Sequence, residues 1–553
     1  MNRTKILIIG GVAGGATAAA RARRVDENAQ IILFEKGEYI SFANCGLPYY
    51  LGGVIKDRND LLVIEAKAFA DRYKIDVRIF NEAVSIDRQK KRISVRDIFK
   101  NRSYFESYDK LILSPGADPI KLPFEGINSD RIFNLRNIPD SDRIKTYVDS
   151  QRPKSAVIVG GGFIGLEMAE NLSRKGIKTI IIEMLNQVMA PLDFEMASMV
   201  QNHLNEKGVI CKLGNGVSSF SEKNGRLVIT LENGDSIESD LVILSAGIRP
   251  KNRLAFEAGL EIGERGGIRV NSAMQTSDPD IFAVGDAIEI TDMVTGLPTM
   301  TALAGPANKQ ARIAADSALG RNSIFKGTIG TAIVKIFDLT VASTGASEKM
   351  LKRHEVPYMV SYTHNGSHAS YYPDATTMAI KLIFSPEQGK ILGSQIVGVD
   401  GVDKRIDVLA TALYASMTVF DLEELELAYA PPYSSAKDPI NIAGFVAANM
   451  LKGDVNTINW EDIDALKEGN EVLIDLRNKE ELDEIGIIEG SIHLPLDELR
   501  DRLDELDKDR HYIVYCAVGM RGYLAHRILL QNGFNSKNLS GGIRTYLGSK
   551  QNL

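Results

Sequence analysis

The chain has 553 residues, 44% of them hydrophobic, which is enough for roughly three to four domains with sizeable cores. Its 65 lysines and arginines against 72 aspartates and glutamates leave a net charge of −7, which argues against nucleic acids or anionic membranes as partners. Three cysteines are too few for a disulfide framework and are typical of a reducing compartment. We therefore expect a cytoplasmic α/β protein without a nucleic-acid or membrane partner.

The chain begins with a strand, a glycine-rich turn and a helix. Residues 5–9 form a short apolar strand, and Gly10-Gly11-Val12-Ala13-Gly14-Gly15 and an Ala- and Arg-rich helix follow. A second strand, residues 31–34, ends at Glu35. The apolar run 6–20 superficially resembles a signal peptide, but a nucleotide-binding βαβ unit explains the same residues better.

A second unit of the same kind begins at residue 156, and its strand leads into Gly160-Gly161-Gly162-Phe163-Ile164-Gly165. Gly160, Gly162 and Gly165 fill the G-x-G-x-x-G positions that allow a tight turn, close approach of the pyrophosphate and helix–strand contact. The following helix start offers N–H groups to the phosphates. The chain therefore contains two Rossmann-like dinucleotide-binding units.

The acidic residue that closes the second unit indicates which nucleotide binds there. Glu183 is expected to accept a hydrogen bond from a ribose 2′-hydroxyl and to repel a 2′-phosphate. No arginine lies within residues 184–189, so NADH is favoured over NADPH.

The first unit departs from the glycine pattern at Val12, so either the pyrophosphate contact is looser or the backbone there needs no positive φ. Gly10, Gly15 and Glu35 remain its candidate nucleotide ligands. The run from Thr276 to Asp286 resembles the second FAD motif of two-dinucleotide flavoproteins, which implies that Asp286 holds the ribityl chain. We expect FAD in the first unit.

Cys45 follows the second strand of the FAD unit closely, within Ser41-Phe42-Ala43-Asn44-Cys45-Gly46-Leu47-Pro48-Tyr49-Tyr50. Its position near a helix start predicts a lowered thiol pKa and an available thiolate. Since the site is polar and flanked by glycine, we interpret Cys45 as a redox-active residue.

Residues 1–450 resemble coenzyme A disulfide reductases, through 41–50, Tyr371-Tyr372-Pro373 and Tyr429-Ala430-Pro431-Pro432-Tyr433-Ser434. Tyr50 stands where dithiol relatives have a second cysteine, so a single cysteine would cycle through a mixed disulfide, persulfide or sulfenic acid. The resemblance implies a homodimer in which Tyr371 and Tyr429 flank the reacting sulfur. It also implies contacts with coenzyme A, as substrate or bound thiol, from Thr17, Arg21, Arg24, Ser41, Asn44, Asn308 and Lys437. Without it, the arginines are an ordinary solvated helix face.

The last 93 residues, 461–553, are expected to form a separate small α/β domain after a polar linker, 451–460. Cys516-Ala517-Val518-Gly519-Met520-Arg521 follows a strand and precedes a helix, so backbone N–H groups can surround the sulfur. Arg521 adds positive charge. The domain resembles a single-domain rhodanese, which implies that Cys516 carries sulfane sulfur as a persulfide.

Cys211 lies in an apolar strand and is interpreted as structural. The seven histidines do not cluster with cysteines at metal-ligand spacings, and His364 and His368 lie in an Asn-Gly-Ser context that does not favour one helical face. We predict no metal site.

The predicted fold is α/β: an FAD-binding domain (1–150 and 276–325), an NAD-binding domain (151–275), an α+β dimerisation domain (326–450) and the rhodanese domain. The predicted activity is NAD(P)H-dependent, FAD-linked reduction of coenzyme A disulfide, coenzyme A persulfide or polysulfide through Cys45, with a sulfurtransferase module. Two alternatives remain. One is an NADH oxidase or peroxidase that uses a sulfenic acid, and the other is a redox-sensing flavoprotein.

Overall fold

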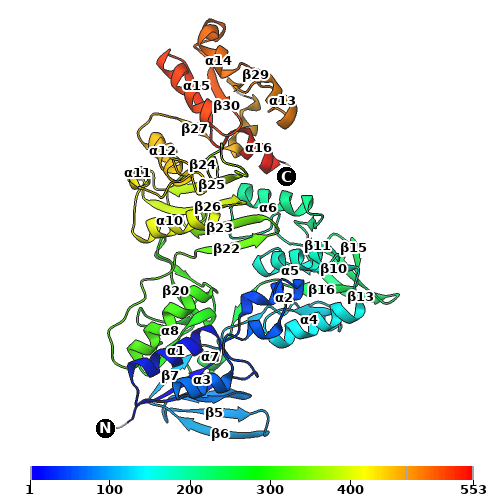
Figure 1. Cartoon of the computed structure of the whole chain (residues 1–553), viewed down its shortest axis with the longest axis vertical. Coiled ribbons are helices and arrows are strands. Elements are labelled where there is room, and N and C mark those ends of the chain that lie inside the picture. The colour runs from blue at the N-terminus through cyan, green and yellow to red at the C-terminus, as the bar shows by residue number, and fades with distance from the viewer. Residues whose placement is uncertain (1–2, 469, 551–553) are drawn as a thin grey trace. The chain divides into compact units, whose positions relative to one another are not determined.

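The computed structural model describes residues 3–468 and 470–550 (Figure 1). The chain forms two compact units, one comprising residues up to Asn186 with Lys212–Thr328, and the other Gln187–Cys211 with Ile329 onward. Within the described part of the chain, each helix is too short or too polar to cross a lipid bilayer.

The first nucleotide unit, which lies in the first compact unit, contains a five-stranded parallel sheet in the order β19-β7-β1-β2-β3. Its strands are β1 (Lys5–Ile9), β2 (Gln30–Phe34), β3 (Asp76–Arg78), β7 (Lys110–Leu113) and β19 (Ile281–Ala283). Ile6, Leu7 and Ile8 have no exposed surface, as expected for a parallel strand covered on both faces.

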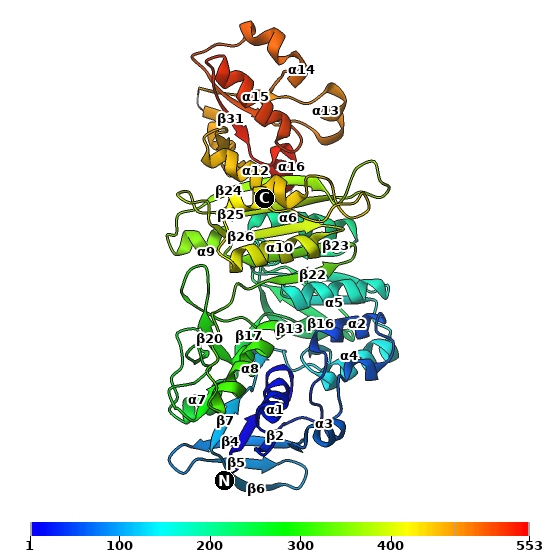
Figure 2. The same ribbon diagram turned by 60° about the vertical axis from the view of Figure 1, so that its left-hand side comes forward.

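Two alanine-rich helices, α1 (Ala13–Val25) and α8 (Ala304–Ala318), pack side by side although they lie far apart in sequence (Figures 1 and 2). Their small side chains, such as Ala18 and Ala311, are fully buried. The late segment therefore returns to complete the first nucleotide unit.

The second nucleotide unit repeats the design with a five-stranded sheet in the order β12-β11-β10-β16-β9, in which β12 (Ile210–Lys212) is an edge strand. Its other strands are β9 (Ile132–Asn134), β10 (Ser155–Val159), β11 (Lys178–Ile182) and β16 (Leu241–Leu244), and its helices are α4 (Ile138–Gln151) and α5 (Phe163–Arg174). Two antiparallel three-stranded sheets accompany the two nucleotide sheets, one made of β4 (Asn81–Asp87), β5 (Arg92–Asp97) and β6 (Arg102–Ser107), the other of β13 (Val217–Lys223), β14 (Arg226–Leu231) and β15 (Ser236–Ser239).

The second unit is built on an antiparallel sheet in the order β22-β23-β26-β25-β24. Its strands are β22 (Ala332–Ile336), β23 (Leu339–Gly345), β24 (Met359–Gly366), β25 (Thr377–Phe384) and β26 (Ile391–Gly398). The helices of this part are α6 (Phe194–Glu206), α9 (Glu348–Arg353), α10 (Val402–Tyr414), α11 (Val419–Glu424) and α12 (Pro439–Leu451).

The C-terminal domain has a parallel sheet in the order β27-β31-β30-β28-β29. Its elements are β27 (Thr457–Ile458), β28 (Glu471–Asp475), α13 (Lys479–Ile485), β29 (Ile492–His493), α14 (Leu496–Leu499), β30 (His511–Tyr515), α15 (Met520–Gln531), β31 (Asn535–Leu539) and α16 (Gly542–Lys550). The segment that we expected to be a linker, 451–460, contains β27. Its short, polar sequence concealed a strand because β27 is defined by pairing with the distant β31.

The same segment anchors the C-terminal domain on the rest of the second unit. Trp460 is buried and stacks on Phe194 at the start of α6, with ring centroids 6.1 Å apart. The Tyr362 N–H on β24 donates to Ser540 Oγ (3.3 Å), and His364 Nε2 lies 2.9 Å from Thr545 Oγ1. α16 packs on α6, so the domain is docked through side-chain and backbone contacts.

Candidate active site

Both glycine loops use their first and last glycines for close packing. Gly10 has φ +96° and Gly160 φ +109°, a region that favours glycine. A Cβ on Gly15 would overlap the carbonyl oxygen of Gly10, and one on Gly165 would overlap that of Gly160. The helix start is therefore held tightly against the preceding turn in each unit.

The middle position of each loop has a negative φ, −92° at Val12 and −83° at Gly162. The backbone therefore manages without positive φ, which was one of the two possibilities that the sequence left open. A Cβ on Gly162 would meet no heavy atom within 4 Å. This open space at a helix start suits a pyrophosphate approaching the backbone N–H groups.

Two glutamates close the two units in the same way. Glu35 accepts hydrogen bonds from the Gly11 N–H (2.8 Å) and the Gly37 N–H (2.7 Å). Glu183 accepts from the Gly161 N–H (2.7 Å) and the Leu185 N–H (2.9 Å). Each carboxylate therefore lies beside its glycine loop at the end of a strand, where a ribose is recognised.

Asp286 follows β19 in the 3₁₀ helix η3 (Gly285–Ala287). The Gln310 side chain on α8 accepts from the Gly285 N–H (2.9 Å) and fixes this turn. Burial raises the pKa of Asp286 above its usual range. Together with the first glycine loop, this carboxyl suits the flavin dinucleotide, and the second loop suits NADH.

Cys45 lies in the 3₁₀ helix η1 (Asn44–Gly46), immediately before α2 (Leu47–Gly52), and is exposed. The expectation of a lowered thiol pKa was wrong. The surrounding protein removes water from the sulfur and raises the pKa of Cys45, and the carboxylates of Glu167 and Asp286 raise it further. The helix start does not outweigh these effects, because η1 and α2 are short.

Sequence reasoning missed Tyr49 and Glu167, which lie beside Cys45. Tyr49 Oη donates to Glu167 Oε1 over 3.1 Å. Burial and the nearby Glu170 raise the pKa of Glu167 to about 7. A glutamate one turn into the helix after the second glycine loop was the available signal, but nothing local links that helix with Cys45.

Tyr371 and Tyr429 come from separate loops of the second unit, and their hydroxyl oxygens lie 2.7 Å apart. Both side chains are exposed, and the hydrogen bond with Tyr429 raises the pKa of Tyr371. The structure therefore brings together the two tyrosines that were selected from distant motifs. Their assignment to the reacting sulfur stays a prediction.

The C-terminal cysteine sits at the base of a loop between β30 and α15. Cys516 is buried, and its Sγ accepts a hydrogen bond from the Gly519 N–H over 3.1 Å. Gly519 has φ +105°, which turns this N–H toward the sulfur and starts α15. The loop thus provides one backbone donor to the sulfur of Cys516.

The positive charge of Arg521 is shared between the Cys516 sulfur and Glu481, because both terminal nitrogens of Arg521 donate to the Glu481 carboxylate over 2.6 Å. Glu481 and the nearby sulfur of Cys516 raise the pKa of Arg521. Arg477, which forms a buried ion pair with Asp475 (2.6 Å), also donates to the Glu481 carbonyl (3.1 Å). Glu481 therefore connects the loop to the core of the domain.

The model of the pyridine nucleotide-disulphide oxidoreductase family matches residues 4–311, more than half of the chain. The chain belongs to this family. The dimerisation domain of the same oxidoreductases matches residues 331–439, and a rhodanese-like domain matches residues 460–548. The predicted fold class, with two dinucleotide-binding domains, a dimerisation domain and a rhodanese domain, is confirmed.

This oxidoreductase has relatives over its reductase part and over its full length. It is 36% identical over 447 residues to a coenzyme A disulfide reductase of Staphylococcus haemolyticus (strain JCSC1435), covering 81% of this chain and 100% of that protein. The reduced CoADR-RHD crystal structure from Bacillus anthracis is 50% identical, with a TM-score of 0.98, covering 100% of this chain and 99% of that one. A NAD-dependent persulfide reductase from A. fulgidus is 38% identical, with a TM-score of 0.92, covering 98% and 100%. The predicted resemblance and the predicted cofactors, FAD and NADH, are confirmed.

Some of the residues predicted to bind coenzyme A in the first compact unit are engaged in hydrogen bonds or ion pairs, and others are exposed. The Thr17 hydroxyl donates to Asn308 Oδ1 (2.5 Å), so these two residues meet across α1 and α8. Arg21 forms a two-pronged ion pair with Asp316 (2.8 and 3.0 Å), while Arg24 is exposed.

The helix with these arginines is not a uniformly solvated face. Arg23 is buried and donates to five backbone carbonyls, among them those of Tyr73 and Ala29. Ser41, at φ +47°, accepts the Val63 N–H and lies next to the first glycine loop, to which its own N–H donates. Asn44 is exposed beside Cys45.

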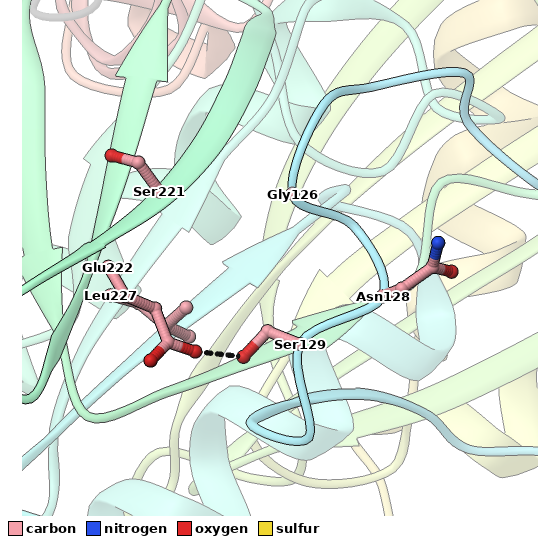
Figure 3. A pocket seen from close by; sticks show the side chains of 6 residues that line it. All are labelled: Gly126, Asn128, Ser129, Ser221, Glu222 and Leu227. Atoms are coloured by element: carbon pink, nitrogen blue, oxygen red, sulfur yellow. Dashed lines mark hydrogen bonds between the residues drawn. The ribbon is translucent and has the colours of Figure 1, made fainter.

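Two surface hollows lie apart from the glycine loops and cysteines. One of about 290 Å³ is lined by Gly126, Asn128, Ser129, Ser221, Glu222 and Leu227, with Ser129 donating to Glu222 (Figure 3). It contains none of the predicted site residues. The other, of about 260 Å³, includes the exposed Lys437.

One trio of carboxylates in the described residues, Asp193, Glu195 and Glu348, is close enough to share a cation. The ammonium group of Lys381 already lies among them, at 2.9, 2.5 and 2.7 Å, and has no exposed surface. We therefore interpret this trio as the counter-charge of a buried lysine. Cys211 fits a structural role, since burial raises its pKa to about 12.

Proposed function

We propose that this oxidoreductase uses NADH to reduce coenzyme A disulfide or coenzyme A persulfide at Cys45, and that Cys516 handles the sulfane sulfur. The observation that carries the proposal is the presence, in one chain, of a single exposed cysteine in the FAD unit and a second cysteine in a rhodanese loop. Relatives named coenzyme A disulfide reductase and persulfide reductase support it.

When bound, FAD supplies the two-electron chemistry that links NADH with the sulfur site. The Cys45 thiolate attacks one sulfur of the substrate disulfide, so that a Cys45–sulfur bond forms and a thiolate leaves. Two electrons then cleave the mixed disulfide and restore the Cys45 thiolate with a second thiolate product. Overall, one disulfide, NADH and a proton give two thiols and NAD⁺; a persulfide gives one thiol and sulfide.

The chain's own residues would bind and position these reactants. Glu183 favours a nucleotide with a free 2′-hydroxyl, and Arg24 offers a positive charge to a phosphate of coenzyme A. Tyr371 and Tyr429 would supply a proton or stabilise a thiolate at the sulfur. The exposure of Cys45 leaves room for a substrate larger than a free thiol.

A homodimer and a cytoplasmic location belong to the same proposal. The match to a dimerisation domain over residues 331–439 supports the dimer. The three cysteines are unpaired, which suits a reducing compartment.

The test is anaerobic NADH oxidation with coenzyme A disulfide, coenzyme A persulfide or polysulfide, with sulfide measured in parallel. We expect Cys45→Ser to abolish NADH oxidation with all three substrates. Cys516→Ser should lower the release of sulfide from sulfane donors such as thiosulfate and leave the reduction of coenzyme A disulfide unchanged. Cys211→Ser is the matched control and should behave as the parent. Unchanged sulfide release by Cys516→Ser from every sulfane donor would refute the rhodanese role.

The same experiment separates the alternatives. A water-forming NADH oxidase from Lactobacillus brevis is 25% identical, with a TM-score of 0.78, over 82% of this chain. If oxygen supports faster NADH oxidation than the sulfur substrates, and an oxygen adduct occupies Cys45, the oxidase is the better description. If every substrate turns over slowly, the redox-sensor alternative stands.

A further inference from the structure

The helix of the second nucleotide site packs directly against the helix that follows Cys45. α2 lies against α5 (Figure 2), and the contact is so close that a Cβ on Gly52 would overlap the Asn171 side chain. One face of α5 therefore meets the segment that carries the redox cysteine. A carboxyl group on this face is held at a set distance from the sulfur by packing.

Glu167 is that carboxyl group. It is the fifth residue of α5, the helix that starts at the glycine loop, and it is partly buried. Tyr49 on α2 donates its hydroxyl to Glu167 Oε1 over 3.1 Å. Glu167, Tyr49 and Cys45 thus form one cluster of proton-binding groups, in which two members are joined by a hydrogen bond.

The remaining charges around the cluster come from three elements. On α5, Glu170 is buried and pairs with Arg174 over 2.8 Å. The charge of Asp286 in η3 also raises the pKa of Cys45, and Lys145 of α4 lies over the ring of Tyr50, 5.5 Å from its centroid. The charged groups that act on Cys45, Glu167 and Asp286, are therefore acidic. An ionised thiol and an ionised Glu167 oppose each other in a partly desolvated site.

We propose that Glu167 is a positioning residue that controls the ionisation of Cys45, holding a proton while the sulfur is a thiolate and releasing it when the sulfur becomes neutral. The inference rests on the proposed role of Cys45 as the reacting sulfur. When Cys45 attacks a disulfide, the negative charge leaves the site with the departing thiolate, and Glu167 then releases its proton to solvent. When two electrons from NADH restore the thiolate, Glu167 takes a proton from solvent.

This role fits the titration of the two groups. Burial, with a contribution from Glu170, raises the pKa of Glu167 to about 7, so the carboxyl can gain or lose a proton near neutral pH. Partial desolvation of the sulfur by the surrounding protein, and then the charge of Glu167, raise the pKa of Cys45. The influence is mutual, because a proton on either group makes ionisation of the other easier.

The experiment measures Cys45 directly in the purified holoenzyme after anaerobic reduction. The rate of iodoacetamide labelling is followed from pH 5 to pH 10 by mass spectrometry of the Cys45 peptide. We expect Glu167→Gln to lower the apparent pKa of Cys45 by about one unit, which is about a tenfold faster labelling below that pKa. Glu170→Gln tests the sign of the effect: because Glu170 raises the pKa of Glu167, its removal leaves Glu167 ionised to lower pH and should not lower the pKa of Cys45.

Tyr49→Phe provides a second test should Glu167→Gln fail to fold. The Tyr49 hydrogen bond lowers the pKa of Glu167, so its removal leaves the carboxyl protonated to a higher pH and should also move the Cys45 pKa downward. Labelling profiles of Glu167→Gln and Tyr49→Phe that coincide with the parent would overturn the proposal. Because labelling needs no sulfur substrate, a shifted pKa without turnover would instead count against the proposed function alone.

Discussion

Replacing Lys381 with methionine should strongly destabilise the second unit. The Lys381 side chain has no exposed surface, and its Nζ contacts Asp193, Glu195 and Glu348. Methionine has a similar length but no charge, so Lys381→Met leaves three buried carboxylates facing one another. Removing one partner of a buried ion pair typically costs about 3–5 kcal/mol.

The titration of Glu348 gives a similar magnitude. Its pKa is lowered from 4.5 to about 2, against the effect of burial, with the Lys381 charge as the largest favourable cause. A shift of 2.5 units corresponds to about 3.4 kcal/mol. This stabilisation is present above pH 4.5 and is lost as the pH falls through 2, so the parent and Lys381→Met should converge in acid.

The chain contains a convenient probe for this measurement. Trp460 is the single tryptophan, and it stacks on Phe194, which lies between two of the carboxylates in sequence. Urea unfolding followed by Trp460 fluorescence at pH 7 should give a free energy lower by about 3–5 kcal/mol for Lys381→Met. Lys352→Met is the control, because Lys352 is half exposed and should cost less than about 1 kcal/mol.

Equal unfolding midpoints for Lys381→Met and the parent would refute this reasoning. A loss that is the same at pH 7 and pH 3 would also contradict it, because repulsion between carboxylates should decrease when they are protonated. In either case, the apolar packing of the lysine stem, not its charge, would hold the start of α6 on the sheet.

Two further predictions concern the nucleotide loop and the rhodanese loop. Gly165→Ala should prevent folding of the second nucleotide unit, because the added Cβ overlaps the Gly160 carbonyl oxygen. Gly162→Ala should fold, because its Cβ meets no heavy atom within 4 Å, and should raise the KM for NADH by about tenfold when initial rates are measured against NADH concentration. Glu481→Gln should lower the melting temperature of the rhodanese domain at pH 7. Since Arg521 lowers the pKa of Glu481 from 4.5 to about 2, calorimetry should find this difference above pH 4.5 and lose it toward pH 2.

The sequence was sufficient for features that depend on neighbours along the chain. Residues 5–9 were expected as a strand and form β1 with the same bounds, and the expected strand 31–34 forms β2 with one residue more. Cys516 and Gly519 are three residues apart, so their hydrogen bond follows from one local turn. Such local patterns are enough to predict local structure, because strands and tight turns require particular residue types at fixed spacing.

Features that depend on distant contacts could not be predicted in this way. Glu167 meets Tyr49 across 118 residues, and Tyr362 of the dimerisation sheet meets Ser540 of the rhodanese domain across 178. The error on the Cys45 pKa has the same origin. The sequence showed a helix start nearby, but the desolvation and the Glu167 charge that outweigh it come from the tertiary structure.

The internal duplication explains how two nucleotide sites come to act on one sulfur. In each nucleotide unit the last glycine holds the helix after the glycine loop tightly against the preceding turn, so that the helix start offers its N–H groups to the phosphates. Further along α5, α2 packs against the helix. Glu167 therefore needs no dedicated loop to reach Cys45. The helix that binds the reductant also places a proton-holding group beside the sulfur to be reduced, so the chemistry at that sulfur depends on how α2 packs on α5.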